Sequence, residues 1–392
     1  MHIKYSKKIS NIKKYPFKIL DEQILKSQSQ TLETIDFGIG DPVAPTPNCI
    51  IRTLTKAAYH RASSGYPKDI GELSYRISCA QYLLREYNII VNPHTEVSAT
   101  LGSKEAIFHL PLALINPSDL VICPTPGYPM YKTGTHFAGG KVYFVPLKEK
   151  NNFLIDLDAI PHSVACKAKI IWTNYPNSPT GITAPKWWLQ KLVSWGEKYN
   201  VIIAADEGCY NDIYVNKKPH SILEITRKGI ITFYSLSKRN NMTCYRIGFV
   251  AGDSRIISVF RHIKTNIDSG PPTFIQDAAR QALSDLNTHA TMSRQYIQKR
   301  NIISKAMVAR GFSITTSNST FYLWQKCKNG LTGKKLTKYL LKIGILVLPG
   351  SLISDTINTN FNPGIHFVRF ALMPNTIDTK EASHRIKYKL VL

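Results

Sequence analysis

The stretch VIIAADE, residues 201–207, is an apolar run that ends in two carboxylates. Such a run, rich in Val and Ile and without polar alternation, is typical of a strand that is covered on both faces of a sheet. Similar short runs lie at 121–124, 141–147, 169–174, 230–235 and 247–252. The lengths of chain between these runs suit βα units, so the sequence predicts an α/β domain with a mostly parallel sheet sandwiched by helices.

The pattern changes after about residue 275. A long, charged helical stretch at 277–311 is followed by short apolar segments at 321–327, 345–350 and 366–372, with a second helix at 333–343. Helices beside a few strands predict a smaller α+β domain. We therefore expect three parts: an N-terminal segment, 1–48, that packs with the small domain through helical spacing at 17–28; a large domain, 49–275; and a small domain, 276–392.

The composition is that of a globular chain of 392 residues. No apolar run approaches the ~18 residues that span a bilayer, and the basic start lacks a secretory signal pattern. Seven scattered cysteines suggest neither a disulfide framework nor a zinc site, which favours a reducing cytoplasm. The net charge of +24 would suit a protein that binds nucleic acid. However, no basic helix, aromatic-interleaved stripe or zinc-finger spacing concentrates the charge in one place, so lysines dispersed over the surface are the favoured explanation. Attraction of dicarboxylate substrates by this positive charge remains an alternative.

Two polar clusters follow strands and suit an anion. In LGSKEA, residues 101–106, Ser103 and Lys104 open an amphipathic helix whose free amides can hold a phosphate, although a serine N-cap alone would give the same pattern. In the second cluster, YSLSKRNNMTCYRIGF at 234–249, two hydroxyls, an amine and a guanidinium gather around one strand end. These groups are Ser235, Ser237, Lys238 and Arg246.

Other residues fall at the same predicted edge. Asp206 ends a buried strand, where α/β proteins place ligands, and a carboxylate there can keep a pyridinium protonated. The turn-rich stretch NYPNSPTGITAP, residues 174–185, would fold next to this crevice. Arg369 in the small domain could form a bidentate clamp on a substrate carboxylate. A lysine among such cations, here Lys238, suits Schiff-base chemistry.

Taken together and in this order, these motifs resemble the class I/II aminotransferases, which are fold-type I enzymes dependent on pyridoxal 5′-phosphate. The resemblance covers nearly the whole chain, from YPF at 15–17 and IDFGIGDPVAPTP at 35–47 to VRFAL at 368–372. It implies an enzyme that uses this cofactor and works as a homodimer with shared sites. The residues that match family positions are Gly40, Ser103, Tyr128, Pro179, Gly181, Asp206, Lys238, Arg246 and Arg369.

The resemblance also implies a role for each residue. Lys238 would bond covalently to the cofactor and move a proton at the substrate α-carbon, Asp206 would pair with the pyridine nitrogen, and Tyr128 would stack on the ring. Tyr66 would reach the phosphate in a neighbouring subunit. The phosphate would be held by Ser103, Lys104, Ser235, Ser237 and Arg246. The substrate would meet Gly40, Arg369 and the aromatic lid residue Tyr15.

The sequence departs from the family pattern in three places. The usual Asn before Pro-Thr-Gly is replaced by Ser178, so either its hydroxyl substitutes for the amide or Asn177 is rotated in as a cofactor and substrate ligand. Cys209 stands where the family has a tyrosine, and a one-residue bulge made easy by Gly208 would restore Tyr210. Cys244 replaces a usual glycine, which predicts a less permissive turn before Arg246.

Within the family, several stretches resemble the LL-diaminopimelate aminotransferases of lysine and peptidoglycan precursor synthesis. These stretches lie at 102–120, 137–147, 151–161, 174–181 and 264–283. That resemblance implies transfer from glutamate to tetrahydrodipicolinate. Candidates for binding the second amino acid group are Lys104, Tyr15 and either Asn266 or Ser269, the last two near a segment that borders the partner's site in similar enzymes. The alternatives are an aspartate, N-succinyl-diaminopimelate or broad-specificity aminotransferase, a lyase or decarboxylase of the same fold, and a non-catalytic regulator that binds the cofactor.

Overall fold

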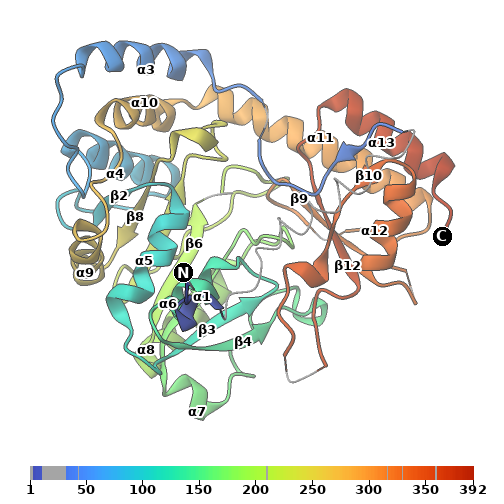
Figure 1. Cartoon of the computed structure of the whole chain (residues 1–392), viewed down its shortest axis with the longest axis horizontal. Coiled ribbons are helices and arrows are strands. Elements are labelled where there is room, and N and C mark those ends of the chain that lie inside the picture. The colour runs from blue at the N-terminus through green and yellow to red at the C-terminus, as the bar shows by residue number, and fades with distance from the viewer. Residues whose placement is uncertain are drawn as a thin grey trace.

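The computed structural model describes residues 3–10, 32–42, 44–208, 211–315, 317–328, 330–357 and 360–392. A large α/β part and a smaller C-terminal part stand side by side (Figure 1). The helices are α1 Lys7–Ser10, α3 Asn48–His60, α4 Leu73–Tyr87, α5 Ser103–Leu114, α6 Met130–Phe137, α7 His162–Ala165, α8 Lys186–Tyr199, α9 Ser254–Thr265, α10 Thr273–Ser284, α11 Asn287–Ala309, α12 Gly333–Lys342 and α13 Thr376–Lys389. The strands are β1 Ile35–Asp36, β2 Val97–Thr100, β3 Leu120–Thr125, β4 Lys141–Pro146, β5 Ala168–Thr173, β6 Ile202–Gly208, β7 Ile230–Ser235, β8 Gly248–Gly252, β9 Tyr322–Lys326, β10 Ile345–Leu346, β11 Leu348–Pro349 and β12 Phe367–Ala371.

The central sheet has seven strands in the order β2-β8-β7-β6-β5-β3-β4. Neighbours from β7 to β4 pair in parallel, which confirms the mostly parallel sheet expected from the apolar runs. Strand β8, one of those runs, is antiparallel to both β2 and β7. The carboxyl ends of β3, β5, β6 and β7 therefore share one edge with the start of β8.

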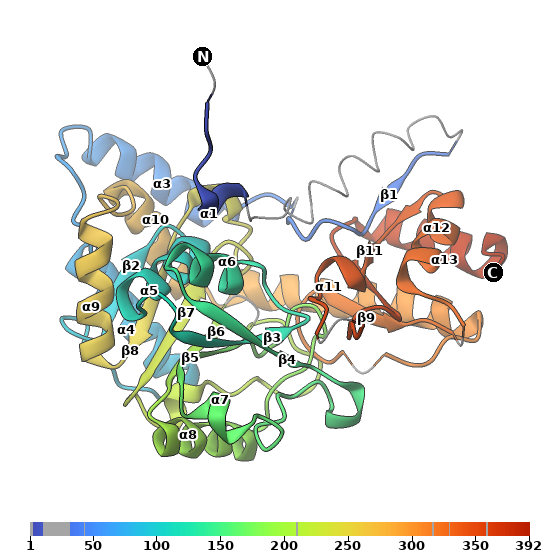
Figure 2. The ribbon, with the colours of Figure 1, turned by 60° about the horizontal axis from the view of Figure 1, so that its bottom comes forward.

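Helices cover both faces of the sheet. Helices α5, α6 and α9 pack on one face and α4, α8 and α10 on the other, with α5 and α6 above and α8 below the strands in Figure 2. Successive residues of β5 show the consequence, because Ile170 and Trp172 join one core and Ile171 joins the other. This explains why the runs lack polar alternation.

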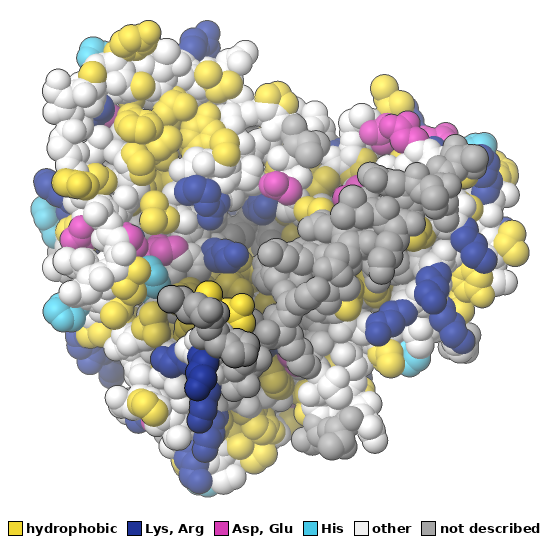
Figure 3. Space-filling model, in the orientation of Figure 1, with side chains coloured by type: hydrophobic (Ala, Val, Ile, Leu, Met, Phe, Trp, Pro, Cys, Tyr) yellow, Lys and Arg dark blue, Asp and Glu magenta, His cyan; other side chains and the backbone are white. Residues whose placement is uncertain are grey.

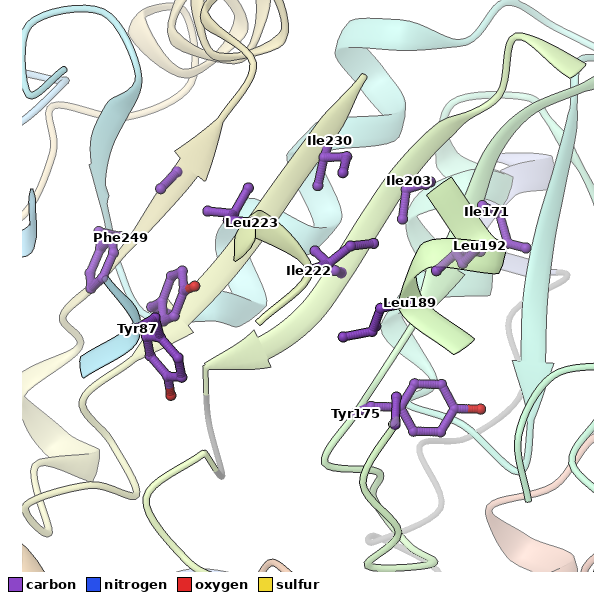
Figure 4. Close-up of a cluster of buried hydrophobic side chains, with 14 of the residues drawn as sticks. Tyr87, Ile171, Tyr175, Leu189, Leu192, Ile203, Ile222, Leu223, Ile230 and Phe249 are labelled. Atoms are coloured by element: carbon purple, nitrogen blue, oxygen red, sulfur yellow. The ribbon is translucent and has the colours of Figure 1, made fainter. Parts of the chain in front are cut away.

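One of these cores is drawn in Figure 4. Leu189 and Leu192 of α8 lie against Ile171 and Ile203 of the sheet, and all four side chains are buried. Burial of each such side chain contributes roughly 1.5–3 kcal/mol to folding. Helix α8 ends at Tyr199 and is capped by Asn200, whose left-handed conformation suits asparagine.

The smaller part is built on the antiparallel sheet β11-β12-β9 and helices α11, α12 and α13. Residues near the N-terminus pack with it, since β1 pairs in parallel with β10 and the Phe37 ring lies 5.8 Å from that of Phe370. The helix expected over 17–28 lies outside the described residues.

The single helical stretch expected over 277–311 is two helices, because the chain leaves the helix at Asp285 and Leu286. Helix α10 packs against α3 and α4 of the large part, whereas α11 packs against α13 of the small part. The domain boundary expected after residue 275 falls inside α10. Domain boundaries stay a prediction, and this packing favours a boundary after Ser284. Among the described residues, no helix has the length and apolar character needed to cross a bilayer.

Candidate active site

A cavity of about 480 Å³ opens at the shared edge where the parallel strands end. It lies between the large part and strands β9 and β12 of the small part. The structure brings most of the expected site residues together in its wall: Gly40, Ser103, Lys104, Tyr128, Ser178, Asp206, Ser235, Ser237, Lys238, Arg246 and Arg369. These residues are scattered over more than three hundred positions of the chain, so the fold creates the site.

The amine of Lys238 reaches into this cavity from the loop after β7. Its Nζ donates a hydrogen bond to the Gly40 carbonyl oxygen at 2.8 Å and lies 3.8 Å from a carboxylate oxygen of Asp41. Both partners belong to the N-terminal segment that also lines the cavity. The lysine amine is therefore held in the wall of the cavity.

Arg246 and two serines form a cluster of donors at one end of the cavity. Arg246 donates from Nη1 to Ser237 Oγ at 3.3 Å, and the Ser235 hydroxyl accepts from the Ser237 amide at 3.2 Å. A Cβ at Gly102 would lie 2.6 Å from Arg246 Nη2, so glycine leaves room for the guanidinium beside the start of α5. This grouping of cation, hydroxyls and helix N-terminus suits a phosphate.

The structure accounts for Cys244. It is exposed in the short 3₁₀ turn Thr243–Tyr245, and the left-handed backbone conformation falls on Arg246, with φ of 52°, rather than on the cysteine. A 3₁₀ turn needs no positive φ, so a side chain at position 244 is tolerated.

Asp206 projects from β6 toward the cavity and is buried. Its Oδ2 accepts a hydrogen bond from the Tyr131 hydroxyl at 2.7 Å, and Tyr131 in turn stacks on Trp172 with ring centroids 4.7 Å apart. The Tyr128 ring lines the cavity and meets Tyr131 edge to face at 5.8 Å. A buried carboxylate fixed in this way can face a cationic ring nitrogen.

The turn after β5 places other residues in the cavity wall than the one expected, and the role of Asn177 stays a prediction. Asn177, expected to touch the ligand, lies outside the cavity wall, because its side-chain oxygen accepts from the Thr180 amide at 3.1 Å and hydroxyl at 2.7 Å. Ser178 and Asn174 line the cavity instead, and Asn174 Oδ1 accepts from the Ser178 amide at 2.8 Å. Of the two readings of Ser178, the geometry favours the one in which its hydroxyl replaces the amide.

A bulge follows Asp206. The pairing of β6 with β7 shifts register between Asp206 and Gly208, which confirms the expected one-residue bulge. A Cβ at Gly208 would come within 2.0 Å of Tyr234 Cδ1, so this bulge requires glycine. Cys209 and Tyr210 lie outside the described residues, and the placement of Tyr210 stays a prediction.

Arg369 enters from β12 and is only 3% exposed. Its Nη2 donates to the Gly38 carbonyl oxygen at 2.8 Å, and its guanidinium lies 4.3 Å from the centroid of the Tyr322 ring. Tyr322 also lines the cavity, and its hydroxyl occupies the space in which a Cβ at Gly40 would stand. The aromatic platform and the backbone contact orient the arginine fork.

Besides Asn177 and Tyr210, four more expected residues lie away from this cavity wall or outside the described part. Tyr66 is 94% exposed, and Asn266 and Ser269 are also exposed. Tyr15 lies outside the described residues. Sequence reasoning missed Tyr131, Asn174 and Tyr322, although Tyr131 stands three residues after the expected Tyr128 and Asn174 opens the stretch NYPNSPTGITAP.

Comparison with known proteins agrees with this geometry. A family model described as aminotransferase class I and II matches residues 33–360. The LL-diaminopimelate aminotransferase of Aquifex aeolicus is 39% identical over 98% of each chain. The substrate-bound BacF structure from Bacillus subtilis superposes with a TM-score of 0.91, at 29% identity, over 100% of this chain and 99% of that chain. A probable N-succinyldiaminopimelate aminotransferase structure from Thermus thermophilus gives 0.87, at 26% identity, over 95% of this chain and 99% of that chain.

The family match spans more than half of the chain, and the relative from Aquifex aeolicus is similar along almost its entire length. The structural neighbours share the arrangement of a mostly parallel sheet flanked by helices, beside a smaller C-terminal part. The chain therefore belongs to the class I and II aminotransferase family.

Proposed function

We propose that the protein binds pyridoxal 5′-phosphate in the cavity at the strand ends and uses it to transfer amino groups between amino acids and 2-oxo acids. One observation carries this proposal. The Lys238 amine, the buried Asp206 carboxylate and the anion-binding cluster of Ser235, Ser237 and Arg246 all open into the same space of about 480 Å³. This donor set matches the aldehyde, ring nitrogen and phosphate of the cofactor.

The residues present fit the phosphate. Arg246 supplies a fixed positive charge, and Gly102 keeps the space beside it free of a side chain. Ser103 opens α5 next to this space, so the first amides of the helix add donors and the favourable end of the helix dipole. The phosphate would lie among Ser103, Lys104, Ser235, Ser237 and Arg246.

When bound, the cofactor supplies an electron sink that stabilises negative charge at the substrate α-carbon. Lys238 would anchor the aldehyde carbon and then carry the proton to and from the α-carbon, because its amine lies inside the cavity. Asp206, oriented by the Tyr131 hydroxyl, would keep the ring nitrogen protonated. Tyr128 would cover the ring and exclude water from that face.

Arg369 would bind the substrate α-carboxylate. A bidentate pair between guanidinium and carboxylate is favoured here, because the arginine is buried and already held by Gly38 and Tyr322. Arg369→Lys keeps the charge but loses the fork, and we expect kcat/KM for an amino acid to fall about 100-fold. The same amino acid as its α-amide should lose little, so an equal loss for both compounds would contradict this role.

For the substrate, we propose LL-diaminopimelate, with glutamate and 2-oxoglutarate as the other pair. The similarity to the enzyme of Aquifex aeolicus supports this choice. Lys104 and Asp41 also place charges of both signs in the cavity wall, as the zwitterionic far end of diaminopimelate requires. The runner-up is N-succinyl-diaminopimelate, which the Thermus thermophilus neighbour favours, although its succinyl group removes the far ammonium that Asp41 would meet.

The cofactor is tested first. Purified protein incubated with pyridoxal 5′-phosphate should gain a visible absorbance band that borohydride fixes to the chain and that Lys238→Ala does not form. Protein that takes up no cofactor would refute the proposed function.

The substrate is tested by the loss of that band when one amino acid at a time is added. LL-diaminopimelate and glutamate should react fastest, with aspartate, alanine and N-succinyl-LL-diaminopimelate as comparisons. A reaction with aspartate but not with LL-diaminopimelate would overturn the substrate assignment and leave the aminotransferase assignment intact.

We also propose that two copies associate through the face that carries α3 and α10. Hydrophobic side chains gather on this face, at the upper left of Figure 3. Tyr59 of α3 and Phe274 of α10 are exposed, and so are Tyr66 and Ile267 in the segments that follow α3 and α9. A gathering of exposed apolar side chains on one face marks an interface. Tyr66 would then reach the phosphate of the other subunit.

Hybrid dimers test this arrangement. Tyr66→Ala and Lys238→Ala should each be nearly inactive alone. Mixed after dissociation and reassociation, they should regain activity, because half of the dimers contain one site with both native residues, which is about a quarter of all sites. A mixture that stays inactive while the two chains demonstrably exchange would exclude a shared site.

A further inference from the structure

A fully buried ammonium lies behind the proposed phosphate site. Lys264, in the last turn of α9, is 0% exposed, and its Nζ lies 2.5 Å from Asp268 Oδ1 and 3.3 Å from Glu105 Oε1. Helix α9 packs beside α5 (Figure 1), so the lysine bridges two helices and a loop. A buried charge is tolerated only when it is paired, and this lysine is paired on both sides.

Glu105 joins the lysine to the turn that begins α5. One oxygen, Oε2, accepts a hydrogen bond from the Leu101 amide at 3.1 Å, and the other faces Lys264. Ser103 and Lys104, which lie between Leu101 and Glu105 in the chain, line the cavity. The carboxylate therefore holds the phosphate-facing turn from behind.

Asp268 joins the lysine to the loop after α9. The same oxygen that faces Lys264 accepts from the Gly270 amide at 2.8 Å. Gly270 approaches the 68–69 loop so closely that a Cβ would lie 2.6 Å from the Lys68 carbonyl oxygen. Tyr66, on the proposed interface, precedes that contact by two residues. One ammonium thus links the turn at 101–103, α9 and the loop at 268–270.

This cluster needs no metal ion. Glu105, His109 and Asp268 bring ligand-type atoms within 4.8 Å of one another. The Lys264 ammonium contacts two of those three groups and supplies the positive charge itself. A cation would have to displace it from a buried, paired position.

We propose that Lys264 is a positioning residue for the cofactor phosphate. Its ammonium pulls Glu105 and Asp268 together and so fixes the first turn of α5, which directs Ser103 and Lys104 at the phosphate. The inference rests on the proposed function, because it requires that the cavity hold a phosphorylated cofactor.

The test compares two ligands on three variants. Lys264→Met removes the charge with little change of volume. Asp268→Asn removes the negative charge from the link to the loop but leaves Lys264 paired with Glu105, and Glu381→Gln is the matched control. Glu381 of α13 pairs with Arg385 at 2.8 Å and is no part of the cavity wall or of the proposed interface. The dissociation constants of pyridoxal 5′-phosphate and of pyridoxal, the same aldehyde without a phosphate, are measured by fluorescence titration.

Both network variants should bind pyridoxal 5′-phosphate about tenfold more weakly than the native protein, a loss typical of a disturbed charge-assisted contact. Their affinity for pyridoxal, and the affinity of the control for both ligands, should change less than about twofold. Should Lys264→Met fail to fold, Asp268→Asn carries the comparison. Unchanged affinity for the phosphorylated ligand, or an equal loss for both ligands, would overturn the inference. Native protein that binds neither ligand refutes the proposed function instead.

Discussion

Replacing Glu207 with glutamine should remove a pH dependence of stability that this carboxyl imposes. Glu207 follows Asp206 on β6, and since successive side chains of a strand face opposite sides, it points away from the cavity. It is only 2% exposed and accepts hydrogen bonds from the Tyr234 hydroxyl at 3.0 Å and the Ile222 amide at 3.1 Å. Burial outweighs these bonds and raises the pKa of Glu207 to about 7.

The direction of the effect follows from proton uptake. In the unfolded chain a glutamate releases its proton near pH 4.3. Between that pH and about 7 the folded protein still binds the proton, so the stability associated with Glu207 is fully present below pH 4.3 and decreases as the pH rises. One pKa unit corresponds to 1.36 kcal/mol, so ionisation should lower the free energy of unfolding by roughly 4 kcal/mol at pH 8, of which about 3 kcal/mol is lost between pH 4.5 and pH 8.

Urea denaturation of the cofactor-free protein, followed by tryptophan fluorescence from pH 4.5 to 8, measures this effect. Glu207→Gln should gain about 3 kcal/mol relative to the native protein across that range, with the change complete slightly above pH 7. Glu197→Gln, an exposed substitution on α8, is the control and should show no such trend. A difference between Glu207→Gln and native protein that stays constant with pH would show that Glu207 ionises as in water.

Further substitutions probe the walls of the cavity and its support. Tyr131→Phe removes the hydrogen bond to Asp206 and should weaken cofactor binding about tenfold in a fluorescence titration, without unfolding the protein. Gly40→Ala places a Cβ 2.3 Å from the Tyr322 hydroxyl and should lower kcat/KM about tenfold, with partial recovery when Tyr322→Leu is added. Arg239→Met breaks the buried ion pair with Asp212, which is 2.6 Å long, and should lower the free energy of unfolding in urea by about 3–5 kcal/mol. Adding Asp212→Asn, which neutralises the carboxylate, should recover part of that stability.

The sheet and the location of the site could be predicted from sequence because both depend on strand physics. A strand buried on both faces needs apolar residues at every position, and the carboxyl ends of parallel strands share one edge. Asp206, Ser235 and Lys238 stand at or just after such ends, so their meeting in one cavity follows from the strands alone.

The direction in which a side chain points inside a turn could not be predicted from the sequence. Asn174 and Asn177 stand three residues apart in the same turn, and only hydrogen bonding separates them: Thr180 holds Asn177 away, while Asn174 binds the Ser178 amide and lines the cavity. Tyr322 was missed for another reason. An aromatic residue in an apolar strand indicates core packing, and only the antiparallel pairing of β12 with β9 brings Arg369 over its ring.

The bulge at the end of β6 shows why spacing along the chain is a weaker guide than strand register. From Asp206 to Gly208 strand β6 advances by two residues, whereas its neighbour β7 advances by one, from Phe233 to Tyr234. Glu207 is therefore left without a partner on β7. Pairing resumes at Gly208 because glycine alone fits against the Tyr234 ring. The pairing of Asp206 with Phe233, before the bulge, keeps the register of the preceding residues. A residue can therefore be inserted directly after Asp206 without moving its carboxylate, provided that the residue at which pairing resumes, here Gly208, carries no side chain.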